Sequence, residues 1–455
     1  MKRFLPFQRH RLAQGVAAAC AAGLLLHGGA AQALGLMQAY QAALQNDSMY
    51  QGAIHENEAG QQNRIIGRAG LLPQLSSDYA YSHNRTDVTA TDALGVPDLS
   101  HPVYNSRVAE VTLRQGIINL DGVARYKQGI AQSNYSSAQL ELHRQELIVR
   151  VCGAYMDALL SREQLRLAEA QRDMYAEQKR VNDHLFEKGE GTKTDMLETQ
   201  SRLDLAEAQV LETKDTLQTA YDTLRSIVGT DVDVSTLDDL APGFHTLALS
   251  GGGIAEWQAT ALANNPEIVS ARYGIEAAHQ EVNKDRAGHA PKLDFVASYS
   301  KNTAQTIDTY NQDSTVRSIG VQLTVPLYSG GSVAATTKQA VAGQEKARSD
   351  LQVATDKVTI ELRKEYALVV SSVARIAALE KAVASSELLI KATEQSIKGG
   401  VRINLDLLNA QQQFYTSKRD LAQARYNYLV GLLKLRAAAG TASTDDVREM
   451  AAYFH

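Results

Sequence analysis

The sequence predicts a mixed fold in which long antiparallel coiled-coil helices continue into short strands of a membrane β-barrel, built as two tandem repeats. Three observations support it: an internal duplication, segments of alternating apolar residues, and long stretches without proline. The composition agrees, because 44% apolar residues are too many for a disordered chain. A net charge of −5 supplies no basic surface, so no nucleic-acid partner is expected.

The first 33 residues have the form of a secretory signal peptide. A basic start precedes a short apolar run from Val16 to Leu26, and Ala31-Gln32-Ala33 fits the small-residue cleavage rule. The run is too short to cross a bilayer. An alternative interpretation makes Cys20 the lipidated first residue of the mature chain. Without that lipidation, the mature chain keeps one cysteine, Cys152, and can form no internal disulfide.

An internal duplication divides the chain into similar halves. Residues 43–84 align without gaps on 261–302, and residues 127–230 align on 338–441. The aligned pairs include Pro73/Pro291, Gly189/Gly400, Asp195/Asp406 and Gly229/Gly440. We therefore expect a repeat, a Gly-rich linker, a second repeat and a C-terminal tail, at 34–230, 231–254, 255–441 and 442–455.

Each repeat contains two short segments that alternate as β-strands do. They lie at about 75–84, 107–117, 293–301 and 318–328. One face of each segment is apolar, as Leu293, Phe295 and Tyr299 illustrate, and the opposite face is polar. Membrane strands have this pattern, with lipid on one side and water on the other. The polar segments 84–106 and 302–317 are expected to be loops. The alternative is a half-buried sheet in a soluble domain.

Long helices are predicted beside the strands, because no proline lies between residues 103 and 241 or after 326. The helix at about 122–187 would span ~100 Å, and those at 36–69 and 192–228 ~50 and ~55 Å. Stacked end to end, the two shorter helices would match the long one and form a tall cylinder. Large and small residues alternate in the heptads of the last helices, which favours close antiparallel packing. A plain coiled coil explains the heptads but not the strands.

The strand count predicts an oligomer. Four strands cannot close a barrel, and open strand edges do not occur in hydrocarbon. Two chains give eight strands around an interior filled by side chains, whereas three give twelve and leave room for a passage. The geometry therefore favours a trimer or a larger ring.

Enzymatic interpretations find no support. The histidines lack metal spacing, since His55-Glu56 is not followed by a second histidine four positions after the first. The segment 189–194 is glycine-rich but lacks the spacing of a phosphate-binding loop. The Gly-x-Ser-x-Gly motif of serine hydrolases is absent. We expect no catalytic residue, no metal and no cofactor, so the energy for any transport must come from a partner.

Several motifs together resemble the TolC family of outer-membrane efflux and secretion ducts. These are Ala-Leu-x-Asn at the start of each repeat, Arg-Ala-Gly before Pro73 and Pro291, Pro-Leu-Tyr-Ser-Gly-Gly at 326–331, and Gly followed by Asp-x-Leu-x-x-Gln at 189–200 and 400–411. The chain looks most like the type I protein secretion members. The first repeat departs from the pattern at 113–117, where the Pro-Leu-Tyr signature is missing.

The resemblance implies a homotrimer with a twelve-stranded barrel in outer-membrane lipid and a long periplasmic helical tunnel. It also implies two partners, a periplasmic adaptor (membrane fusion) protein and an inner-membrane ABC-type transporter. The expected function is a passive conduit of type I secretion for exported protein. An alternative is the duct of a small-molecule efflux pump, and an interpretation of a different class is a periplasmic coiled-coil scaffold.

The resemblance also places a gate at the periplasmic tip. Asp195 and Arg402 match a salt bridge between the two helical hairpins, Asp406 matches the first position of an acidic ring, and Asn409 stands where the second acidic residue is usual. The helical turns that would contact the adaptor contain Gly189, Gly191, Thr192, Gly400 and Val401. Our hypothesis is that Asp195 and Arg402 hold the tip shut; the alternative is that both are solvated charges at helix starts.

Overall fold

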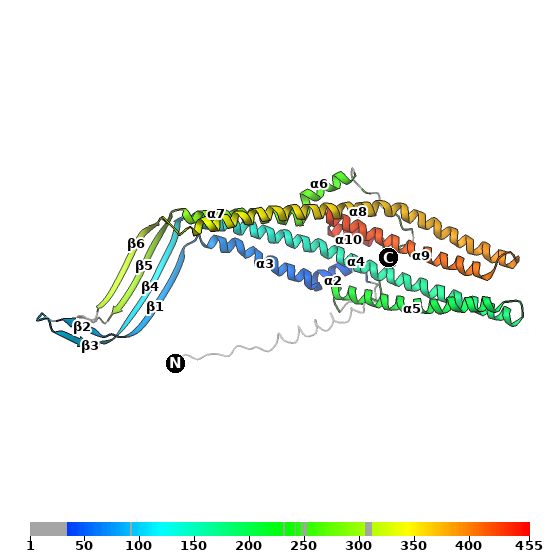
Figure 1. Ribbon diagram of the computed structural model, residues 1–455, viewed down its shortest axis with the longest axis horizontal. Helices are drawn as coiled ribbons and strands as arrows, with labels where there is room; N and C mark the ends of the chain where they lie inside the picture. The colour runs from blue at the N-terminus through cyan, green and yellow to red at the C-terminus, as the bar shows by residue number, and fades with distance from the viewer. Residues whose placement is uncertain are drawn as a thin grey trace, which may run out of the picture.

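The computed structural model describes residues 34–455 except 92, 231–232, 242, 247–248, 250–252 and 305–311. The predicted signal peptide and Cys20 lie outside these residues. The molecule is elongated, with a layer of long helices and a sheet at one end (Figure 1). The end of the helical layer far from the sheet is called the helical tip below.

Two uninterrupted helices, α4 (Leu120–Glu187) and α8 (Ser332–Lys398), run the whole length of the helical layer. On the sheet side, α3 (Ser48–Ala69) and α7 (Pro266–Arg286) pack beside them, in the order α3, α4, α7, α8. On the tip side, α5 (Lys193–Val228) and α9 (Asn404–Ala438) take over, in the order α5, α4, α9, α8. At either end of the layer, each repeat thus contributes its long helix and one shorter helix packed beside it.

The short helices of each repeat meet end to end through an asparagine. Asn46 Nδ2 donates to the carbonyl of Val228 at the end of α5, at 2.9 Å. Asn265 Nδ2 donates in the same way to the carbonyl of Ala438 at the end of α9, also at 2.9 Å. Both bonds satisfy a helix-end carbonyl that has no partner inside its own helix.

A glycine closes each of these joints. Gly229 and Gly440 follow α5 and α9 with φ of 102° and 73°, in the region that favours glycine. A Cβ on Gly440 would lie 2.6 Å from the backbone of Asn264. Only glycine therefore allows the end of α9 to approach the start of α7 so closely.

The helix predicted at 36–69 is divided, which corrects the sequence-based expectation. The structure has α2 (Leu36–Asn46) and α3, separated by Asp47 in an extended conformation. Asp47 caps α3 by accepting from Tyr50 N at 2.7 Å, and such side-chain bonds compete with a continuous helix. The second repeat breaks similarly between α6 (Ile254–Asn264) and α7, where Asn265 is the cap.

The four strands form one antiparallel sheet in the order β1-β4-β5-β6, so β1 and β6 are its edges. The strands are β1 (Gln74–Arg85), β4 (Val103–Ile118), β5 (Lys292–Ala304) and β6 (Gln312–Thr324). The apolar face has no protein core against it, since Leu75 is 71% exposed and Ile319 80%. That exposure argues against the half-buried sheet of a soluble domain.

Two strand expectations were wrong in detail. Strand β6 is Gln312–Thr324 rather than about 318–328, so strands β5 and β6 both extend into the segment 302–317 that was expected to be a loop. Strand β6 ends early because Pro326 has no N–H to donate to a sheet. The segment 84–106, expected to be a loop, contains a small hairpin of β2 (Val88–Thr91) and β3 (Pro97–Ser100). Its alternation is too short to be distinguished from loop composition.

The crossing from sheet to helix in the first repeat is made without the Pro-Leu-Tyr signature. The pairing of β4 with β5 shifts register between Gly116 and Ile118. Asn119 then caps α4 by accepting from Gly122 N at 2.9 Å. A bulge and a cap therefore replace the proline turn of the second repeat.

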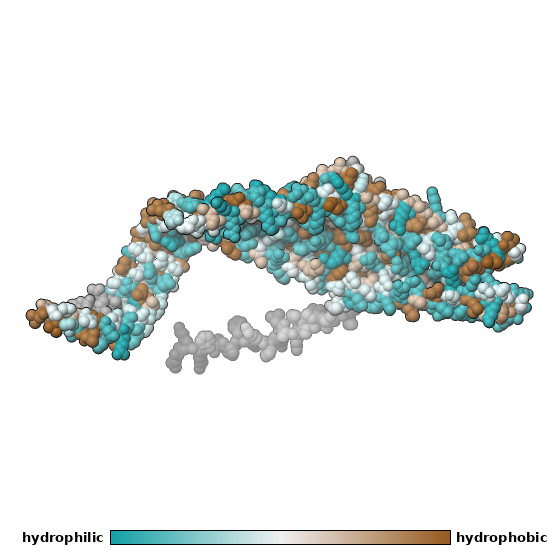
Figure 2. All heavy atoms as spheres, viewed as in Figure 1, coloured by the Kyte–Doolittle hydropathy of each residue, from teal (hydrophilic) through white to brown (hydrophobic). Residues whose placement is uncertain are grey.

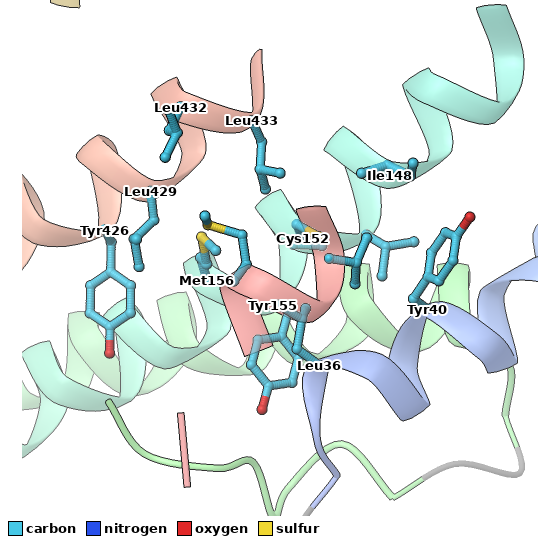
Figure 3. Close-up of a cluster of buried hydrophobic side chains, with 14 of the residues drawn as sticks. Leu36, Tyr40, Ile148, Cys152, Tyr155, Met156, Tyr426, Leu429, Leu432 and Leu433 are labelled. Atoms are coloured by element: carbon cyan, nitrogen blue, oxygen red, sulfur yellow. The ribbon is translucent and has the colours of Figure 1, made fainter. Parts of the chain in front are cut away.

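The main hydrophobic core lies midway along the helical layer, where α2, α4, α5, α9 and α10 (Thr444–Ala451) meet (Figure 3). Tyr155 is fully buried there, and its hydroxyl donates to Leu34 O at 2.8 Å and accepts from Asp238 N at 3.2 Å. Phe454 packs edge-on against the Tyr155 ring. The C-terminal segment thus belongs to the core. No helix among the described residues is long and apolar enough to span a bilayer.

We predict that the Cys152 thiol does not react in the folded protein. Cys152 is fully buried, and burial raises the pKa of its thiol to about 12, so the reactive thiolate is absent even at pH 9. Ellman's reagent should detect no thiol in mature protein between pH 7 and 9, and one per chain after denaturation. Rapid reaction before denaturation would contradict this packing, with a Cys152→Ser variant as the control.

We predict that Asp47 stabilises the joint between α2 and α3. Its carboxylate is buried and pairs with Arg150 Nη2 at 2.7 Å, so Asp47→Ala removes a cap and leaves a cation without its partner. The expected loss is about 2–3 kcal/mol, since Arg150 keeps some contact with water. Asp47→Asn retains the cap, as Asn265 does in the second repeat, and should lose less. The thermal midpoint measured by circular dichroism should be highest for the wild type, lower for Asp47→Asn and lowest for Asp47→Ala. Equal midpoints in the three proteins would exclude this role for Asp47.

Candidate functional site

Two tight turns bring both helical hairpins to the helical tip (Figure 1). After α4, Gly189 has a φ of 76°, and after α8, Gly400 has a φ of 74°. In each turn two backbone N–H groups donate back to the last helical turn: Gly189 to Phe186 and Glu190 to Leu185, Gly400 to Ile397 and Val401 to Ser396. This is the Schellman ending, which requires glycine at its left-handed position.

The two turns differ in chemistry despite this shared backbone. The first turn exposes charged residues, Lys188 and Glu190. The second exposes apolar residues, with Val401 82% and Ile403 62% exposed, beside the exposed charges of Lys398 and Arg402. Figure 2 shows the apolar residues gathered at the end of the α8–α9 hairpin. Of the other predicted turn residues, Thr192 is exposed and Gly191 is half-buried.

Thr192, and not Asp195, caps helix α5. Thr192 Oγ1 accepts from Asp195 N at 3.1 Å and donates to Asp195 Oδ2 at 2.5 Å. The carboxylate of Asp195 is therefore held over the first turn of its own helix, where the helix dipole favours a negative charge.

Asp195 and Arg402 line the same groove between the two hairpins, with a volume of about 480 Å³. Arg402 Nη1 lies 4.0 Å from Asp406 Oδ2, one turn further along its own hairpin. No ion pair joins Asp195 to Arg402 within the part of the chain that the structure describes. A single chain thus places the two residues of the predicted bridge on one groove without pairing them.

Asn409 contacts a residue that the sequence did not single out. Its Oδ1 accepts from Arg202 Nη2 of α5 at 3.0 Å, and Arg202 Nη1 also donates to Gln412. Arg202 therefore ties the first hairpin to the second beside the predicted acidic ring position. The duplication gave no signal for it, because the equivalent residue of the second repeat is Gln413.

Among the described residues, no group of three or more histidine, cysteine or acidic side chains could hold a metal ion. The groove between the hairpins carries charged and amide side chains from both of them, such as Asp195 and Arg402. Such groups can form ion pairs and hydrogen bonds from one hairpin to the other.

Comparison with known proteins identifies relatives over nearly the whole chain. The profile of a family described as outer membrane efflux protein matches residues 39–230 and 257–441. The alkaline protease secretion protein AprF of Pseudomonas aeruginosa is 41% identical, with 93% of this chain and 88% of that protein aligned. The proteases secretion protein PrtF of Dickeya chrysanthemi is 36% identical, with 95% and 93% aligned.

Solved structures share the fold at low sequence identity. The outer membrane channel CmeC of Campylobacter jejuni superposes with a TM-score of 0.78 at 17% identity, covering 92% of this chain and 90% of that one. A membrane protein from Pseudomonas aeruginosa gives the same TM-score at 19% identity, covering 89% and 93%. The arrangement of long helices and sheet is thus shared with channel proteins.

We predict that Arg202 restrains the start of α9. In Arg202→Ala the exposed contact to Asn409 and Gln412 is lost, and amide hydrogen exchange across 404–412 should accelerate about two- to fivefold. Arg180→Ala is the control, because Arg180 pairs with Glu177 on its own helix and joins no hairpins. Equal exchange in both variants would remove this role from Arg202.

Proposed function

We propose a protein-export function from one premise: the chain belongs to the outer membrane efflux protein family. The protein is the outer-membrane channel of a type I secretion system. It conducts exported protein passively from an inner-membrane transporter and its periplasmic adaptor to the exterior. The strands lie in the outer membrane, and the helical layer extends into the periplasm.

The observation that carries the proposal is that the relatives of high sequence identity are named for protein secretion. Proteins named for protease secretion are 41% and 36% identical over almost their full lengths. A relative named for efflux, outer membrane efflux protein BepC of Brucella suis, is only 26% identical over a similar span. Export of a protein is therefore favoured over the alternative, a duct for small-molecule efflux.

Open edges support a trimer. Among the described residues, each edge strand of the sheet, β1 and β6, has no neighbour on its outer side, and hydrocarbon does not tolerate unpaired backbone groups. The helical layer likewise ends in α8 on one side and in α3 and α5 on the other. Apolar residues of α8 remain exposed in one chain, including Val353, Ile360, Val370 and Leu388. Three copies joined edge to edge would close twelve strands and cover both helical edges.

The proposed gate acts between subunits. Because Asp195 and Arg402 are not paired within one chain, the bridge that closes the tip forms across neighbouring chains. Asp406 and Asn409 face the narrowed passage as a ring that carries one carboxylate per subunit. The turns with Gly189, Gly191, Thr192, Gly400 and Val401 contact the adaptor, which shifts this gate open.

Deletion of the gene tests the function directly. We expect the deletion to abolish release of a protein cargo, measured by mass spectrometry of the culture medium, and the wild-type gene to restore it. Resistance to drugs and detergents, measured as minimum inhibitory concentrations, should change little. Normal protein release with lost resistance would support the efflux alternative. Extraction without detergent as a monomer would support the periplasmic scaffold instead.

Replacement of Arg402 tests the gate. We expect Arg402→Ala to raise the time-averaged conductance of single channels in planar bilayers, because the ratio of open to closed states rises by no more than about fivefold for each weak exposed ion pair lost. The gain should shrink in high salt, which screens the bridge already in the wild type. Arg180→Ala serves as the matched control, since that arginine pairs on its own helix. Unchanged conductance in Arg402→Ala would leave the bridge without a role.

A further inference from the structure

A closed ring of uncharged side chains joins the two hairpins just above the turns. Gln178 Nε2 donates to Asn182 Oδ1 at 3.2 Å and to Asn404 Oδ1 at 3.1 Å. Asn182 and Asn404 each donate through Nδ2 to Thr199 Oγ1, at 2.7 and 3.3 Å. Thr199 Oγ1 in turn donates to Asp195 O at 2.8 Å. The hydroxyl thus uses its one proton and both lone pairs.

Burial makes this ring sensitive to any separation of the hairpins. Thr199 is fully buried and Asn182 is 6% exposed, while Asn404 is half-buried. Gln178, Asn182 and Asn404 line the same groove as Asp195 and Arg402. A buried donor or acceptor that loses its partner costs more free energy than the bond itself contributes.

Only Asn404 connects the ring to the second repeat. Gln178 and Asn182 belong to α4 and Thr199 to α5, so both bonds that cross between hairpins end on Asn404 of α9. The second repeat has no equivalent ring. Its counterparts of Gln178, Asn182 and Thr199 are Leu389, Thr393 and Ala410, and the counterpart of Asn404 is Lys193.

We propose that Asn404 and Thr199 are positioning residues of the gate, forming an uncharged clasp that holds the two hairpins of one subunit together. The inference rests on the proposed function and extends it to contacts within a subunit. When the hairpins separate, the ring must break at Asn404. Until water enters the groove, the freed groups stay buried without partners, and once water binds them only the net contribution of the two crossing bonds is lost.

The absence of charge distinguishes the clasp from the proposed bridge. Salt screens exposed ion pairs, with a Debye length of roughly 3 Å at 1 M, but leaves buried amide and hydroxyl bonds almost unaffected. The clasp should therefore keep its strength at high ionic strength, where the contribution of Arg402 fades.

Labelling of a buried cysteine tests the clasp without relying on conduction. Leu407 is buried and lines the groove, so the thiol of Leu407→Cys becomes accessible to a maleimide when the hairpins part. The experiment uses the full mature protein in detergent, in which Leu407→Cys is made either as the single substitution or together with Asn404→Leu. Leucine removes both crossing bonds and has the same number and branching of side-chain heavy atoms as asparagine. Lys193→Leu is the matched control at the equivalent exposed position of the first repeat.

We expect Asn404→Leu to raise the labelling rate about 5- to 30-fold, in both 0.1 M and 1 M KCl, with Lys193→Leu unchanged. Thr199→Val should raise it as well, and Thr199→Ser, which keeps the hydroxyl, should restore the wild-type rate. Equal rates in Asn404→Leu and wild type, an equal rise in Lys193→Leu, or a rise that vanishes in 1 M KCl would overturn the proposal. Absence of conductance in the wild-type protein would instead contradict the proposed channel, and the labelling rates would still decide whether the clasp exists.

Discussion

The unpaired edge of the four-stranded sheet is the constraint on which the rest of the molecule depends. In the part of the chain that the structure describes, the outer sides of β1 and β6 leave backbone donors and acceptors without partners, and no core covers the apolar face of the sheet. Such a sheet is stable in hydrocarbon only when neighbouring copies complete it. In the proposed assembly, closing the sheet and joining the subunits are therefore one event.

The main hydrophobic core, midway along the helical layer, fixes the position of the helices that connect the sheet to the helical tip. Tyr155 binds the start of the first repeat through Leu34 O and the linker after that repeat through Asp238 N. Phe454 of the C-terminal segment packs against its ring. Helices α4 and α8 pass this level without a break, whereas the short helices are jointed there. The continuous helices are thus the mechanical link between sheet and tip, and the joints allow the short helices to be placed separately.

Duplication gave the two hairpins the same backbone but not the same chemistry. Gly189 and Gly400 end their helices with the same pair of backbone hydrogen bonds, while the second turn alone adds exposed apolar residues, Val401 and Ile403, to its exposed charges. The polar ring around Thr199 exists only in the first hairpin and reaches the second through Asn404.

The sequence alone determined the features that repeat over short distances. Alternation located the four strands within a few residues, heptads located the helices, and paired glycines such as Gly189 and Gly400 located the turns. The break at Asp47, the early end of β6 and the β2–β3 hairpin were missed, because single residues override periodicity there. Only the tertiary structure revealed the contacts of Arg202 with Asn409 and of Thr199 with Asn404, and kept Asp195 apart from Arg402. These residues lie about two hundred positions apart, and a periodic pattern states which face a residue occupies but not which side chain it meets across a helix interface.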